Sequence, residues 1–130
     1  MSSPLGVAPD TSASLVEAAR RLGPRVRELA DTTERERRLP AELVRAFAEA
    51  GIFRMCVPRP LGGGEVDAAT LVGVLEELAR ADGSAAWCAM IAATSGVVSA
   101  YLPDDAAHEI YGRPDVVSGG VFAPQGRARP

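Results

Sequence analysis

The chain has 130 residues, of which 47% are hydrophobic, and this is enough apolar material for one domain with a real core. A wholly disordered chain is therefore excluded. The formal net charge is −3, and the 14 basic residues are all arginines spread along the sequence, so nucleic acid is not an expected partner.

The first predicted element is an amphipathic helix that follows a frayed tail over residues 1–13. Apolar residues recur at helical spacing from Leu15 to Ala30, with charged residues on the other face. Gly23-Pro24 predicts a kink or a restart within it, because proline lacks the N–H donor. The charged run over residues 32–38 is interpreted as a solvated face or linker.

A second helix is predicted from Pro40, with Gly51 ending it in the left-handed conformation. The apolar stretch over 52–58 is too short for a helix and is expected to run extended into the core. The glycines at 62–64 lack the Lys-Ser/Thr of a phosphate loop and predict a plain turn. Asp67 is the predicted N-cap of a third helix, whose Glu76 and Glu77 face outward.

A fourth helix is predicted from about Ala85 to Tyr101, with Ser84 as its cap. Residues 83–103 carry no charge and are long enough to span a bilayer. The stretch is rich in Ala, Ser, Gly and Thr and has acidic flanks, so a helix buried on all sides by protein is favoured over a membrane span. No membrane partner is expected.

A short fifth helix is predicted from Pro103 to Gly112, and Val116-Val117 begins a β segment. Five helices and one unpaired strand do not make an α/β sheet. The predicted fold class is therefore all-α, an orthogonal bundle of about five helices with a terminal β-strand stub.

Residues with catalytic chemistry are scarce. The single His108 has no nucleophile marked near it and is predicted to lie on the surface. Cys56 and Cys88 stand apart among apolar neighbours without metal-ligand spacing, which predicts buried free thiols in a reducing cytoplasm and no metal site. Trp87 and Met90 are interpreted as core residues or, alternatively, as the lining of a pocket for a flat ligand.

The order of motifs over residues 39–87 resembles the N-terminal helical domain of the acyl-CoA dehydrogenase superfamily. The matching features are a Leu-Pro helix opening, an Ala-Gly-Ile-Phe end, a Val-Pro then Gly-Gly turn, and Glu-Glu-Leu-Ala-Arg-Ala-Asp-Gly-Ser at a helix junction. The Gly-Ser-Ala-Ala-Trp junction and the closing GGVFAPQG resemble the reduced-flavin-dependent hydroxylase branch more than the fatty acyl-CoA enzymes. That branch often places a histidine on the fourth helix, where this chain has Thr94-Ser95.

The resemblance implies a domain division: the helical domain at 14–114 and the start of an incomplete middle β-domain at 115–130. It implies a flavoprotein parent, with FAD or FMN, that dehydrogenates a CH–CH bond or hydroxylates a small organic substrate. Phe122, Ala123 and Pro124 correspond to the stretch that approaches the flavin, and Trp87 and Ser95 are the predicted substrate contacts. No catalytic residue is assigned, because the dehydrogenases' glutamate belongs to the C-terminal bundle.

The resemblance also implies a homo-oligomeric parent, a tetramer or dimer. The 130-residue chain by itself is expected to be inactive and to hold flavin weakly or not at all, since it offers at most one wall of a closed cavity. The alternative hypothesis is a non-catalytic helical module, or a gene remnant, that oligomerises or docks on a longer relative.

Overall fold

The computed structural model describes residues 11–121, 123, 125–127 and 129. Within these residues the chain forms six α-helices and three short 3₁₀ segments. In order they are α1 Thr11–Glu28, α2 Ala30–Glu36, α3 Ala41–Glu49, η1 Ile52–Arg54, η2 Arg59–Leu61, α4 Ala68–Ala79, α5 Gly83–Ser95, η3 Gly96–Tyr101 and α6 Asp104–Tyr111.

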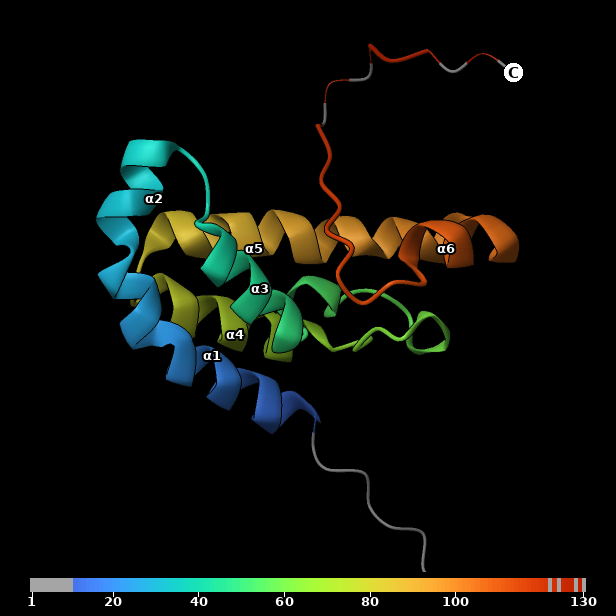
Figure 1. Cartoon of the computed structure of the whole chain (residues 1–130). Helices are drawn as coiled ribbons and strands as arrows, with labels where there is room; N and C mark the ends of the chain where they lie inside the picture. Colours follow the sequence, from blue (N-terminus) through green and yellow to red (C-terminus); the bar gives the residue numbers. More distant parts are fainter. Residues whose placement is uncertain (1–10, 122, 124, 128, 130) are drawn as a thin grey trace, which may run out of the picture.

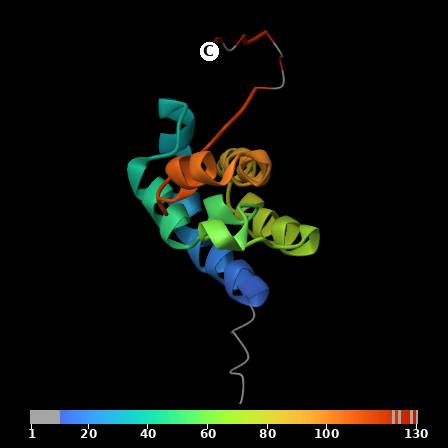
Figure 2. The same ribbon diagram turned by 90° about the vertical axis from the view of Figure 1, so that its right-hand side faces the viewer.

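Helix α5 is the structural centre of the domain. Helix α1 packs along α4, α4 packs along α5, and the short α3 packs against η1 and α1 (Figure 1). Helix α6 lies beside η3 at the far end of α5, as the turned view also shows (Figure 2). This arrangement confirms the predicted all-α fold.

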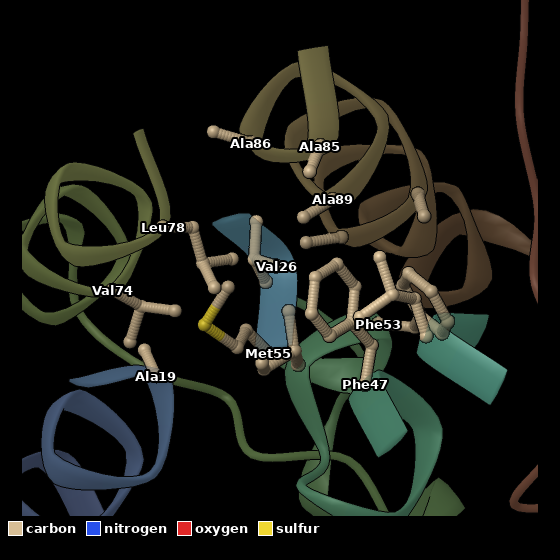
Figure 3. Packing of buried hydrophobic residues seen from close by; sticks show 14 of the residues in the cluster. Ala19, Val26, Phe47, Phe53, Met55, Val74, Leu78, Ala85, Ala86 and Ala89 are labelled. Carbon is tan, nitrogen blue, oxygen red and sulfur yellow. The ribbon is translucent and has the colours of Figure 1, made fainter. Parts of the chain in front are cut away.

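The core forms where α1, α3, α4 and α5 meet the η1 segment (Figure 3). Small residues on α5, Ala85, Ala89 and Ala93, let the neighbouring elements approach closely. Phe47 of α3 meets Phe53 edge to face, with ring centroids 5.8 Å apart. The core thus draws on residues that lie up to some eighty positions apart in the sequence.

One expectation about local structure was confirmed and one was wrong. In the charged run at 32–38, residues 34–38 are exposed, which confirms the predicted solvated face. The run forms the end of α2, on which Thr33 is buried and donates to the Leu29 carbonyl (3.0 Å). The stretch at 52–58 is buried as expected but is not extended. It turns as η1 after Gly51, whose φ of 76° confirms the predicted left-handed helix end.

The predicted N-cap is confirmed for α4 and wrong for α5. Asp67 caps α4 as predicted, since its Oδ1 accepts the Thr70 N–H at 2.7 Å. Helix α5 is capped by Asp82, which accepts the Ala85 N–H at 2.7 Å, and Ser84 instead donates to the same carboxylate at 2.9 Å. Asp82 stands two residues before Ser84, and its carboxylate is the stronger acceptor, so it caps the helix in place of the serine. Proline is accommodated within α1 at Pro24, so this helix does not restart there.

The central apolar helix is neither continuous nor buried on all sides. The α-helix ends at Ser95 and the chain tightens into η3 as far as Tyr101. Gly83–Tyr101 has the length and composition of a membrane span, with a mean hydropathy of 1.3, and 39% of it is buried in the domain. Trp87, Val97 and Val98 on this stretch are exposed.

The described part of the chain after α6 forms no strand, in contrast to the expected β stub from Val116. A β ladder needs a partner for its N–H and C=O groups, and none of the described residues supplies one. The segment instead runs in front of α5 before it leaves the body of the domain (Figure 1).

Candidate functional site

A groove of about 520 Å³ lies between the C-terminal half of α5, η3, the end of α6 and the segment after it. Because the chain returns across α5 after α6, residues 118–121 form the groove's second side (Figure 1). A Cβ on Gly119 would lie 3.8 Å from the Ile91 side chain, so the two sides are in contact range there. The groove is lined by Ile91, Thr94, Ser95, Val97, Val98, Tyr111, Ser118, Gly119, Gly120 and Val121.

The lining that the structure describes is apolar with hydroxyl groups and carries no charged side chain. The hydroxyl of Thr94 donates to the Met90 carbonyl of its own helix at 2.7 Å. Ser95, by contrast, makes no side-chain hydrogen bond to any described residue. An apolar surface with a few oriented hydroxyls is suited to a flat, uncharged organic molecule.

The second side of the groove is held in place by Arg54, a buried arginine with 6% of its surface exposed. Its guanidinium donates to four backbone carbonyls. Two of them lie at the end of α6 and in the following segment, Tyr111 and Arg113 (both 2.8 Å). The other two are Leu61, which ends η2, and Gly62, which follows it (3.4 Å). The planar fork thereby ties the start of the groove-forming segment to the core.

The sequence did not single out Arg54. The pattern that could have indicated it is an arginine within the apolar run IFRMCVP, because a charged residue stands there in a stretch expected to be buried. A charge is buried in such a place only when its donors are fully used, and here the acceptors come from segments distant in sequence.

The junction of α5 with η3 sits against the turn at Val57. A Cβ on Gly96 would come within 2.7 Å of a Val57 methyl, so only glycine fits at this point without a shift. The close approach lets η3 continue along the groove beside α6.

The two predicted substrate residues lie on the same helix but in different hollows. Ser95 lines the groove, whereas Trp87, eight residues earlier, is about 12 Å away along the helix axis. Trp87 is 63% exposed and is therefore not a core residue. It borders a shallow apolar hollow of about 320 Å³ between α4 and α5, together with Val72, Leu75 and Met90.

Of the predicted flavin-contacting residues, Phe122 and Pro124 lie outside the described residues. Ala123 is exposed and has no regular secondary structure. The described residues that precede this stretch in the sequence, Gly119 to Val121, line the groove. The sequence prediction missed most of the groove lining, because it depends on how the chain returns across α5.

Glu77 and His108 lie outside the groove and interact with neighbouring protein groups. Glu77 accepts hydrogen bonds from Arg20 (3.1 Å) and Arg80 (2.8 Å), and the bond from Arg20 lowers the pKa of its carboxyl, the opposite of what a general acid needs. His108 is exposed, as predicted, with Nδ1 2.7 Å from the Asp104 carbonyl oxygen.

Both cysteines are free thiols, as predicted, although they are only partly buried. Desolvation raises the pKa of each, and the charge of Asp82 adds to the effect at Cys88, so neither is an activated nucleophile. Among the described residues no cluster of His, Cys, Asp or Glu could hold a metal ion.

The family model described as acyl-CoA dehydrogenase, N-terminal domain, matches residues 9–109. The indole-3-acetate monooxygenase of Pseudomonas putida is 39% identical over 94 residues, which are 71% of this chain and 24% of the relative. The oxygenase subunit of the flavin-dependent monooxygenase HsaA from Mycobacterium tuberculosis is 32% identical over 114 residues (87% and 29%). The oxygenase component of an FADH₂-dependent resorcinol hydroxylase from Rhizobium sp. is 32% identical over 99 residues (75% and 24%).

The crystal structure of HsaA from M. tuberculosis superposes with a TM-score of 0.76 at 31% identity, covering 82% of this chain and 29% of that one. The chain therefore spans 24–29% of the length of these relatives.

Proposed function

This chain belongs to the acyl-CoA dehydrogenase family through its N-terminal domain, and from that membership we propose that its α5 groove is one wall of a flavin-dependent hydroxylase active site. The relatives with the same helical domain are named as monooxygenases, which favours hydroxylation over CH–CH dehydrogenation. Homo-oligomeric assembly and a cytoplasmic location stay predictions from the sequence.

One observation carries the proposal: Ser95 on α5 and the segment Gly119–Gly120 line the same groove. Only Val121 separates these glycines from the residues at 122–124 that the family resemblance aligns with the flavin ring. The proposed substrate side and the proposed cofactor side of the active site are therefore adjacent in this domain.

The groove residues fit the ring of a flavin but not its phosphates. The backbone at Gly120 is open, since a Cβ there would meet nothing within 4 Å, so a flat ring could approach it closely. No arginine of the described chain lines the groove to receive a phosphate. When bound, reduced flavin supplies the electrons that let one atom of O₂ enter the substrate.

The chain's own residues would bind and shield the reactants rather than move protons. Ile91, Val97 and Val98 supply apolar surface that excludes water, and Ser95 supplies a hydroxyl. Among the residues that the structure describes, no Asp, Glu, Arg or His lines the groove. Proton transfer is therefore assigned to parts of the longer proteins that this chain does not match.

The 130-residue chain alone is expected to bind FAD or FMN only weakly, because the groove holds the ring on one side and leaves the phosphates without a cation. Isothermal titration calorimetry with each oxidised flavin measures this directly. A stoichiometric complex with a dissociation constant of about 1 μM, equivalent to about −8.2 kcal/mol, would contradict the expectation.

A chimera tests the proposed function. Residues 9–121 replace the matching segment of HsaA from M. tuberculosis, and the chimera is expected to keep reduced-flavin-dependent monooxygenase activity. Ser95→Phe in the chimera should lower kcat/KM about tenfold or more, a change of about 1.4 kcal/mol in the barrier, because the ring fills the groove. Product formation and reduced-flavin consumption are measured together.

Ser84→Phe is the matched control, since Ser84 is exposed at the other end of α5 and outside the groove. It should leave kcat/KM unchanged. A cooperatively melting chimera without monooxygenase activity, or equal losses from the two substitutions, would refute the proposal.

A further inference from the structure

Tyr111 lines the groove although most of the residue is buried. The residue ends α6, only 6% of its surface is exposed, and it lines the groove together with Ser95. Tyr101, ten residues earlier, is 83% exposed and lies outside the groove. The two tyrosines of the chain therefore differ in environment.

The Tyr111 hydroxyl donates to and accepts from no described residue, because the hydrogen bond recorded for Tyr111 uses its backbone carbonyl. Among the described residues no buried side-chain oxygen or nitrogen lacks a partner. The phenol oxygen is therefore accessible to solvent, although most of the residue is buried. The groove is the hollow that Tyr111 lines, so a molecule bound there could reach this oxygen.

Two other hydroxyls near the groove are used within the protein, whereas Ser118, which lines the groove, makes no side-chain hydrogen bond to a described residue. Thr94 donates to the Met90 carbonyl (2.7 Å), and the buried Ser99 donates to the Gly96 carbonyl (2.6 Å). The hydroxyls of Tyr111 and Ser95 remain available to a molecule in the groove.

A buried hydrogen bond holds the backbone of Tyr111 in place. The Nη2 atom of Arg54 donates to its carbonyl at 2.8 Å in a buried hydrogen bond. The ring itself is packed, so the hydroxyl is presented with little rotational freedom. A pre-positioned donor loses less entropy when it binds a ligand than a flexible one does.

The charges near the groove disfavour an anionic ligand. The guanidinium of Arg54 donates to backbone carbonyls. Arg113, just after α6, forms an ion pair with Asp115, with Nη2 2.7 Å from Oδ2. A carboxylate in the groove would therefore lose its water without gaining a cation from the described lining.

We propose that Tyr111 is a specificity-determining residue whose hydroxyl hydrogen-bonds an uncharged, ring-bearing substrate with a hydroxyl group in the groove. This inference rests on the proposed function and deepens it. It assigns the polar anchor of the substrate to the end of α6 rather than to Trp87, and it selects neutral ring compounds over arylcarboxylates.

The test uses the ¹⁵N-labelled 130-residue chain with p-cresol as the probe, followed through the amide signals of Ser95, Gly119 and Gly120. Tyr111→Phe is expected to raise the dissociation constant for p-cresol about five- to tenfold, the effect of one hydrogen bond. Tyr101→Phe is the matched control and should leave it unchanged. p-Toluate, which carries a carboxylate in place of the hydroxyl, should bind the unsubstituted chain at least about tenfold more weakly than p-cresol, since it lacks a cation.

A second ligand keeps the result interpretable if Tyr111→Phe alters the fold. Toluene lacks the hydroxyl, so its binding to the unsubstituted chain should be weaker by a similar factor, and the Tyr111→Phe chain should bind toluene and p-cresol alike. Equal p-cresol binding by the unsubstituted and Tyr111→Phe chains overturns the role of Tyr111 but leaves the chimera result standing. Absence of p-cresol shifts at the groove in the unsubstituted chain also overturns the inference, whereas the proposed function fails only with the chimera.

Discussion

Replacing Arg54 with methionine is expected to lower the free energy of unfolding by about 3–5 kcal/mol, because it removes a buried cation that satisfies four backbone carbonyls. Methionine keeps the length and apolar stem of the side chain, so the loss reports the guanidinium. Arg54→Lys should recover only part of it, since an ammonium cannot reproduce the planar fork. Chemical denaturation measures each value.

The control for Arg54 is Arg20→Met. Arg20 is an exposed arginine that pairs with Glu17 and Glu77, and its loss should leave the denaturation midpoint close to that of the unsubstituted chain. If Arg54→Met unfolds at the same midpoint as Arg20→Met, the described hydrogen bonds do not hold the segment after α6. In that case the groove's second side would have to be explained in another way.

Gly63→Ala is expected to lower the free energy of unfolding by about 3 kcal/mol, because the new methyl group would overlap the backbone of the neighbouring turn. A Cβ on Gly63 would lie 1.9 Å from the Val57 carbonyl oxygen and 2.3 Å from its carbon. Backbone atoms cannot move aside as a flexible side chain can. The turn would open and weaken the bond from the Glu65 N–H to the Val57 carbonyl (3.1 Å).

Gly83→Ala is the matched control, because a Cβ there meets nothing within 4 Å. Its stability should be unchanged or raised by about 0.5 kcal/mol, since alanine restricts the unfolded chain. Equal midpoints for the two alanine variants would show that the turn at Gly63 relaxes freely.

Arg54→Met and Gly63→Ala are both expected to affect the groove as well as the stability of the domain. The turn that Gly63 permits carries the Leu61 and Gly62 carbonyls that Arg54 binds, and the same guanidinium holds the Tyr111 and Arg113 carbonyls. The groove therefore depends on one buried cation that joins two segments about fifty residues apart in sequence.

The sequence predicted elements whose signals are local. The helical spacing from Leu15 onward, the aspartate that caps α4 and the glycine that ends α3 were all recognisable, because each acts within one or two turns of its own helix. The order of motifs over 39–87 likewise indicated the family that the N-terminal domain model matches.

The errors share a physical cause. Residues 52–58 were expected to be extended because an apolar run signals burial but not backbone conformation, and the strand from Val116 was expected from propensity alone. Trp87 was taken as core by default, yet which side of a uniformly apolar helix faces solvent depends on its neighbours.

By itself, then, the sequence determined the all-α class, the family and most helix boundaries, since these depend on periodicity and capping within short stretches. The tertiary structure alone decided the groove, because Ser95, Tyr111 and Gly119 meet only when the chain turns back across α5. It also decided the role of Arg54, whose donors find their acceptors in segments that the sequence does not place side by side. Hydrogen bonds and packing between distant segments are settled by the whole fold, and no local pattern encodes them.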